Sequence, residues 1–459
     1  MVYNYKLIFR RNTYEEKNYY YNFNSEESAE NSFSEEINSL YKGDVYREIT
    51  QLESKLNFLS DIVDFSNGEK AEKKKLQFSI NYKFENGESK DYKDIFRYNV
   101  KENGKKLNLL FFFESEEKFE KNYSKFKRVF ADKESVFYET LRQMGIESYN
   151  FVKNPENGKS MFVYDSDNMR LDKSCIEFLN SLDENENYAA VVVLENYVGN
   201  LEQMIKSFPK HIIFQPVLKE NIIGMKPFII KSYAYKVATF IKNRTPILIK
   251  ELDDCSNSMF IGMDLNHDTE GRITNFVISA VDSNGKIIYL KKHGNMELNE
   301  KIDENKIELE IVNSINEYKE INRNLPENIY LYRDGVFLEE CGYIERVIKN
   351  FGINPILIEI NKNSKIMSSK ETKNSLYKMS STNYIFYPFN YLNQKGIEIN
   401  IVSNESRKEN DKVAQESVAM THIYHGSPYS NLKLPYPVHI SDKVARSNYE
   451  WRLYIPYLK

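Results

Sequence analysis

Short apolar runs alternate with helical spacing through the middle of the chain. Runs at 107–113, 189–194 and 212–218 predict strands, and the apolar spacing over 117–130, 135–144 and 200–208 predicts helices. A short apolar run followed by an amphipathic helix, repeated along the chain, is typical of an open α/β sheet with parallel strands. We therefore predict an α/β domain over residues 105–245.

The pattern changes in the second half of the chain. Apolar runs at 259–265, 275–281 and 286–292 predict three strands, and the last two are joined by Asp-Ser-Asn-Gly, a good hairpin signal. A polar helix over about 300–321, a strand at 328–334, a helix ending at Asn350 and a strand at 355–361 follow. Three antiparallel strands, then helix, strand, helix and strand, match a ribonuclease H-like arrangement.

The first hundred residues carry weaker signals. Segments 2–11 and 17–24 predict strands, and the spacing over 46–65 is helical. Alternation over 77–84 predicts a further strand, which ends in a turn at 85–89.

Four carboxylates follow the predicted elements of the second half in order: Asp264, Glu300, Asp334 and Asp442. If the strands of Asp264 and Asp334 are central and parallel, the two side chains meet at one sheet edge, and Asp442 approaches from a C-terminal helix. Clustered acids of this kind bind pairs of divalent ions, and paired ions cleave phosphodiesters. Oxygen ligands select Mg²⁺ or Mn²⁺. We therefore predict a nuclease with two metal ions bound by Asp264, Asp334 and Asp442.

The composition of the chain indicates the cell compartment in which the protein is expected. Three scattered cysteines form no CxxC pair, the N-terminus has no secretion signal, and no run of 18 apolar residues could span a membrane. We expect a cytoplasmic protein with no membrane partner.

The net charge of −4 conceals a basic segment at 203–250, whose only acid is Glu220. Its nine basic residues are Lys206, Lys210, Lys219, Lys226, Lys231, Lys236, Lys242, Arg244 and Lys250. A phosphate backbone favours such a segment, and the interleaved aromatic residues suit single-stranded nucleic acid. A solvated surface is the alternative interpretation.

The strings GMDLNHD, NEKI, YRDG and LPYPVHISDKVARSNYEWRLYIPY resemble the PIWI domain of prokaryotic Argonautes. The preceding domain resembles the Argonaute MID domain, and the similarity to CRISPR-associated Argonautes of the Marinitoga and Thermotoga type runs from about Tyr46 to the C-terminus. This resemblance implies an α/β chain in which an open parallel-sheet MID domain (105–245) precedes a ribonuclease H-like PIWI domain (246–459). A short N-terminal segment (1–45) and a linker-like region (46–104) come first.

The resemblance also implies a catalytic tetrad. Asp264, Glu300, Asp334 and Asp442 fall on its positions, with Glu300 as the mobile glutamate; Glu297 and Glu304 are rivals for that role. A complete tetrad implies an RNA-guided endonuclease that cleaves complementary single-stranded DNA, or RNA, in prokaryotic defence.

The residues that bind the guide's 5′ end would be Asn200, Met204, Gln215 and Lys236. Met204 stands where most Argonautes have a basic residue, which favours a 5′-hydroxyl guide RNA; a core role for Met204 is the alternative. The alignment could also slip by three residues, to Tyr197 and Leu201.

Some 45 N-terminal residues and a linker-like segment cannot hold both the N and PAZ domains of long Argonautes, so we expect either a short architecture or a natural or engineered deletion. A second hypothesis follows: a guide-binding module that recruits a separate effector through a protein partner, without cutting. A third, another ribonuclease H-like enzyme such as a transposase, is disfavoured by the MID-like domain.

Overall fold

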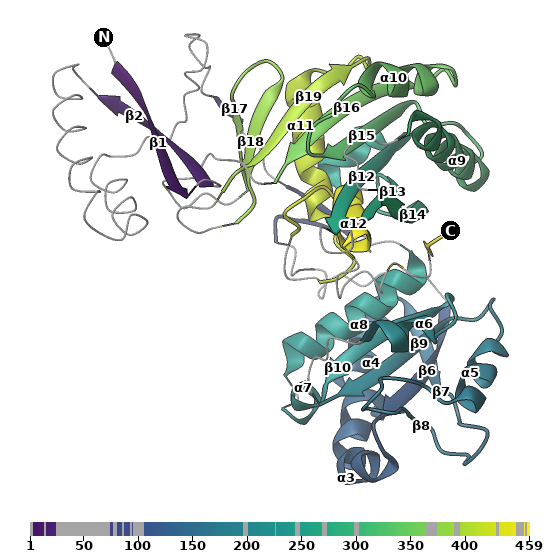
Figure 1. Ribbon diagram of the computed structural model, residues 1–459. Helices are drawn as coiled ribbons and strands as arrows, with labels where there is room; N and C mark the ends of the chain where they lie inside the picture. The colour runs from purple at the N-terminus through teal and green to yellow at the C-terminus, as the bar shows by residue number, and fades with distance from the viewer. Residues whose placement is uncertain are drawn as a thin grey trace.

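The computed structural model contains two α/β units and a β-hairpin near the N-terminus (Figure 1). It describes residues 3–12, 15–23, 74–76, 80–84, 87–91, 94, 105–195, 201–224, 226–243, 248–268, 273–297, 303–362, 374–389, 395–427, 431–446, 454 and 457–459. The predicted helix over 46–65 lies outside these residues.

The first unit is an open parallel sheet, as predicted. Its strands β6 (Lys105–Phe113), β7 (Ile146–Phe151), β9 (Tyr188–Leu194) and β10 (Ile212–Leu218) lie in the order β10-β9-β6-β7, and the short β8 (Phe162–Val163) also pairs with β6. All pairings described among these strands are parallel. β9 is buried along its whole length, which explains its continuous apolar sequence.

Helices cover both faces of this sheet. On one face lie α3 (Glu116–Phe126), with a π-helical turn at Lys127–Ala131, α4 (Val136–Gln143), α7 (Lys219–Ile223) and α8 (Pro227–Lys242); on the other lie α5 (Lys173–Asn180) and α6 (Leu201–Lys206). Ser115 and Ser135 cap α3 and α4 through their side chains.

The pattern gave no prediction for α5, α7, α8, β7 or β8. Eight of the 16 residues of α8 are buried. Because such a helix is apolar on more than one side, it lacks the clear stripe by which an amphipathic helix is recognised.

The second unit is built on a nine-stranded sheet in the order β14-β13-β12-β15-β16-β19-β18-β17-β3. The strands β12 (Ser258–Asp268), β13 (Ile273–Asp282) and β14 (Ile287–Glu297) are antiparallel, whereas β15 (Asn328–Asp334) pairs in parallel with β12 and with β16 (Asn354–Asn361). The remaining strands are β17 (Ser375–Lys378), β18 (Asn383–Tyr387), β19 (Ile397–Asn404) and β3 (Lys74–Leu76). The ribonuclease H-like arrangement is thus confirmed, and the sheet extends beyond it.

The two faces of this sheet carry different helices. Met259, Ile261 and Met263 of β12 pack with α9 (Glu304–Asn322) and α10 (Cys341–Lys349). Phe260, on the alternate side, belongs to the core that includes α11 (Asn410–Ala419) and α12 (Tyr436–Ala445). Short 3₁₀ turns at Lys250–Cys255 and Met420–His422 complete the core.

Near the N-terminus, β1 (Tyr3–Asn12) and β2 (Glu15–Phe23) form the antiparallel hairpin at the far left of Figure 1. Of the predicted strand over 77–84, residues 82–84 form β4 (Tyr82–Phe84), residues 80–81 are not in a strand, and residues 77–79 lie outside the described residues. The predicted turn at 85–89 is wrong in part, because β5 (Gly87–Ser89) pairs back onto β4. β11 (Leu248–Ile249) pairs with β4 on its other side.

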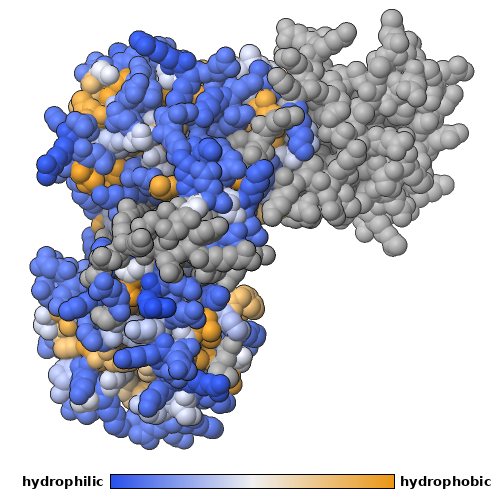
Figure 2. Space-filling view, turned by 180° about the vertical axis from the view of Figure 1, so that it is seen from behind, coloured by the Kyte–Doolittle hydropathy of each residue, from blue (hydrophilic) through white to orange (hydrophobic). Residues whose placement is uncertain are grey.

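The described part of the face shown in Figure 2 is mainly hydrophilic, with small separate apolar patches. Within the described part of the chain, no helix has the length and apolar character needed to cross a membrane.

Candidate functional site

Two of the predicted acids lie side by side on neighbouring parallel strands. Met263 of β12 pairs with Arg333 of β15, so the next residues, Asp264 and Asp334, lie level with each other. Asp334 is the last residue of β15, as predicted. The prediction that Asp264 ends its strand is wrong, because β12 continues to Asp268 in its hairpin with β13.

Helix α12 brings the third acid, Asp442, to the same point. The helix lies so close to β12 that a Cβ on Gly262 would be 2.3 Å from the carbonyl carbon of Pro437. The Ser441 hydroxyl donates to the Gly262 carbonyl at 2.8 Å, and the Ser279 hydroxyl donates to the Pro437 carbonyl at 2.7 Å. A glycine and two serines thus fix the helix that carries Asp442.

The three carboxylates form one compact cluster. Asp264, Asp334 and Asp442 each offer an oxygen, and these oxygens lie within 4.8 Å of one another. Asp264 is 3% exposed and Asp442 is 9% exposed. An all-oxygen set of carboxylates at this spacing fits Mg²⁺ or Mn²⁺.

The pKa values of two of the three carboxylates shift in opposite directions. Burial, together with the nearby charge of Asp334, raises the pKa of Asp264 to about 8. Burial also acts to raise the pKa of Asp442, but the hydrogen bond from Lys362 and the charges of Lys362 and Arg446 outweigh it and lower that pKa below its ordinary value.

A lysine that the sequence analysis did not single out lies within the triad. The Lys362 ammonium contacts Asp334 and donates to Asp442 Oδ1 at 2.6 Å. Burial acts to lower its pKa, but the neighbouring carboxylates raise it above the ordinary value. The one available signal was its position just after β16, the neighbour of β15.

The predicted mobile glutamate, Glu300, lies outside the described residues. Of its two rivals, Glu304 is exposed at the start of α9, and the Glu297 backbone ends β14.

Comparison with known proteins identifies the family of this chain. A model of the bacterial Argonaute middle domain matches residues 77–250, and a model of the Piwi domain matches residues 189–450. The Argonaute protein of Marinitoga hydrogenitolerans is 38% identical over 443 residues, which cover 96% of this chain and 69% of that protein. The chain belongs to the Argonaute family.

Solved structures agree with this assignment. The crystal structure of Marinitoga piezophila Argonaute with 5′ OH guide RNA has a TM-score of 0.79 at 36% identity, covering 95% of this chain and 68% of that one. Its complex with 5′ OH guide RNA and target DNA has a TM-score of 0.78 at 35% identity, covering 98% and 71%. Clostridium butyricum Argonaute, at 18% identity with a TM-score of 0.67 and coverage of 96% and 63%, shares the fold.

Three of the four residues expected at the guide's 5′ end lie on elements of the Argonaute's parallel-sheet unit. Asn200 lies outside the described residues, directly before α6. Met204 of α6 is fully buried in the apolar cluster beneath that helix. Gln215 of β10 is 2% exposed; its amide donates to the Pro216 carbonyl at 2.6 Å, and its Oε1 has no hydrogen-bond partner among the described atoms. Lys236 is half-buried on α8.

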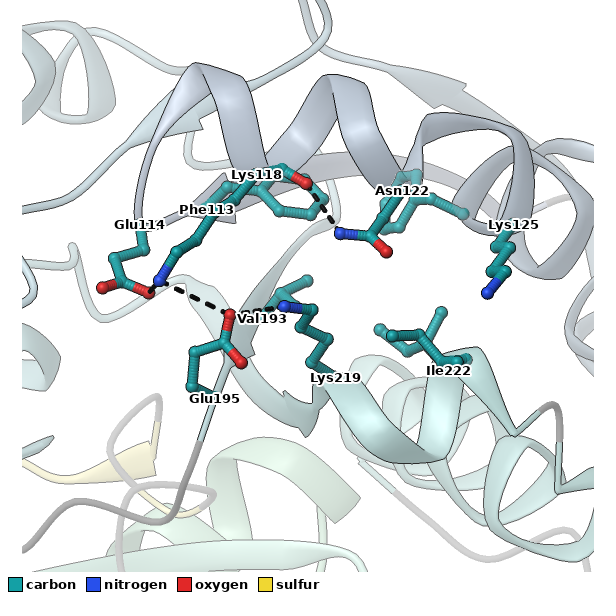
Figure 3. Close-up of a pocket in the computed structure, with 11 residues that line it drawn as sticks. Phe113, Glu114, Lys118, Asn122, Lys125, Val193, Glu195, Lys219 and Ile222 are labelled. Atoms are coloured by element: carbon teal, nitrogen blue, oxygen red, sulfur yellow. Dashed lines mark hydrogen bonds and ion pairs between the residues drawn. The ribbon is translucent and has the colours of Figure 1, made fainter.

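The basic segment is not uniformly available to a ligand. Figure 3 shows Lys219, at the start of α7, and Lys118 of α3 directed at Glu195 after β9. The Lys219 ammonium lies 2.6 Å and the Lys118 ammonium 3.5 Å from the Glu195 carboxylate. Lys118 also pairs with Glu114. Lys118, Lys219 and Glu195 line the cavity drawn in Figure 3. Because both lysines are already paired with Glu195, this cavity offers a ligand less positive charge than the number of its lysines suggests.

Proposed function

We propose that this Argonaute is an RNA-guided endonuclease that cleaves complementary single-stranded DNA, or RNA, by metal-dependent phosphodiester hydrolysis. The observation that carries the proposal is the convergence of Asp264, Asp334 and Asp442, with oxygens within 4.8 Å, in a Piwi domain. A guide-binding protein has no structural need to collect three carboxylates at one sheet edge, since their repulsion is unfavourable.

In the proposed mechanism, Asp264, Asp334 and Asp442 would hold two Mg²⁺ or Mn²⁺ ions. When bound, such ions lower the pKa of the attacking water and stabilise the leaving oxygen. Asp264 has to be deprotonated to act as a ligand. Glu300 would complete the ligand set from the segment before α9. The strand and helix backbones keep the carboxylates oriented without further reorganisation.

The guide's 5′ end would be bound by Asn200, Gln215 and Lys236, while Met204 lies fully buried in the apolar core of the same unit. Met204 brings no charge to this group, which agrees with a preference for a 5′-hydroxyl RNA. The two Marinitoga piezophila complexes contain 5′ OH guide RNA, and one also contains target DNA. By similarity to that protein, we propose the same classes of guide and target here.

The test is replacement of a triad member. Asp334→Asn keeps the shape of the side chain but removes a charged metal ligand, so we expect cleavage to fall to background while guide binding stays at the wild-type level. Both are measured on the same preparation, by product gel and by filter binding. Asp253→Asn, on the 3₁₀ turn before β12 and with an exposed side chain, is the matched control. Retained cleavage in Asp334→Asn would sink the assignment.

The alternative hypothesis, a module that recruits an effector, predicts a different result. Wild-type protein would then bind guide and target tightly and leave the target intact in Mn²⁺.

A further inference from the structure

One ammonium group bridges two of the three carboxylates. Lys362 contacts Asp334 from β15 and Asp442 from α12, the latter at 2.6 Å from Nζ to Oδ1. Its side chain is only 18% exposed. The positive charge therefore lies within the same group of oxygens that would bind a metal ion.

The backbone of this lysine is anchored while its side chain can move. The Lys433 ammonium donates to the Lys362 carbonyl at 2.9 Å, which fixes the chain just after β16. The lysine side chain is a flexible four-carbon stem that ends in a compact charge. Rotation about that stem is sufficient to withdraw the ammonium from the carboxylates.

We infer that Lys362 is a built-in counter-ion of the acidic site, which holds Asp334 and Asp442 together before a metal ion binds and has to leave them when the ion binds. This inference rests on the proposed metal-dependent function. Like charges at this spacing repel, so the carboxylates need a positive partner in the metal-free protein. A metal ion then competes with the lysine, and the apparent metal affinity is weaker than that of the triad alone.

A neighbouring cation provides a matched control. Arg446 also pairs with Asp442, with its Nε 3.0 Å from the same Oδ1, but its side chain is 48% exposed. Among the described contacts it does not reach Asp334. Arg446→Met therefore removes one positive charge beside the site without removing the bridge.

The experiment is a Mn²⁺ titration of the full chain without nucleic acid, read by calorimetry, for wild type, Lys362→Met and Arg446→Met. We expect Lys362→Met to bind Mn²⁺ at least about tenfold more tightly than wild type, the scale typical for changes around metal ligands. Arg446→Met should differ by less than about threefold, because an exposed charge is screened by solvent. Lys362→Arg keeps the positive charge and should therefore lie closer to the wild-type affinity than Lys362→Met does.

Thermal melting of the metal-free proteins adds a second readout. Lys362→Met should melt lower than Arg446→Met, and Mn²⁺ should restore more of its melting temperature. This loss should become smaller in an Asp442→Asn background, because one of the two partner charges of Lys362 is gone.

Equal Mn²⁺ affinity of wild type and Lys362→Met would overturn the inference and leave the proposed function intact. A metal-free melting temperature of Lys362→Met no lower than that of Arg446→Met would also overturn it. If none of the proteins bound Mn²⁺, the metal site of the proposed function would fail, and the inference with it.

Discussion

Burial determines the chemistry of single side chains in this protein. Asp264 and Asp442 belong to the same cluster, yet their pKa values move in opposite directions, because only Asp442 is paired with Lys362 and Arg446. The same reasoning applies to a buried histidine in the core. His425 is fully buried against Phe240 and Tyr436, and burial lowers its pKa to about 3.

The lowered pKa of His425 makes stability depend on pH. Because the folded pKa lies below the unfolded value, the unfolded chain binds a proton that the folded chain does not, and stability falls as the pH drops below about 6.5. We expect this residue alone to cost about 2 kcal/mol between pH 6.5 and 5. The measurement is urea unfolding of wild type and His425→Gln at both pH values. Equal pH dependence of the two proteins would contradict the assignment.

Lys236 is the one charged residue among those proposed for the guide's 5′ end. Lys236→Ala should weaken binding of a 5′-phosphorylated guide by about tenfold, the scale of one lost charged hydrogen bond, and should change 5′-hydroxyl guide binding less. Lys231→Ala, on the same helix α8, is the control. Competition binding with the two guides gives both affinities. Equal losses for both guides in Lys236→Ala would place the lysine on the guide backbone instead.

At the scale of elements, the contact between α12 and β12 decides the geometry of the acids. Gly262 allows the helix to approach the strand, and the hydroxyls of Ser441 and Ser279 fix it there. A methyl group on Gly262 would meet backbone atoms, which cannot rotate away as a side chain can.

Gly262→Ala should therefore push α12 outward and separate Asp442 from Asp264. We expect a loss of stability of about 1–3 kcal/mol and a larger proportional loss of cleavage, with guide binding retained. The free energy of unfolding and the cleavage rate are measured together. Gly342→Ala in α10 is the control, since a Cβ there meets nothing within 4 Å. Wild-type cleavage by Gly262→Ala would show that this contact does not position Asp442.

Much of this element order could be predicted, and the exceptions have physical reasons. β6, β9, β10, β12 and β15 are buried, and their apolar runs mark them clearly. Helix α8 was missed because it is buried on several sides. The meeting of the three acids could be predicted because Asp264 and Asp334 lie on apolar strands that pair in parallel, and Asp442 lies on a C-terminal helix. Lys362 could not, because a lysine after a strand normally extends into solvent, and only the fold brings it to Asp334 and Asp442.

At the scale of the molecule, the chain combines a parallel-sheet unit with a ribonuclease H-like unit (Figure 1). It spans about two thirds of the length of the Marinitoga Argonautes that it matches, at 69% and 68%. The residues proposed for the guide's 5′ end lie in the first unit and the acids in the second. In the proposed function, a guide bound by the first unit would present the target strand to the second.

The most direct test of this account is a cleavage assay with purified full chain, a short 5′-hydroxyl guide RNA and a complementary single-stranded DNA in Mn²⁺. We predict a single cut at a position set by the guide, which EDTA abolishes without releasing the guide. Tight binding of guide and target with an intact target strand in Mn²⁺ would contradict the account.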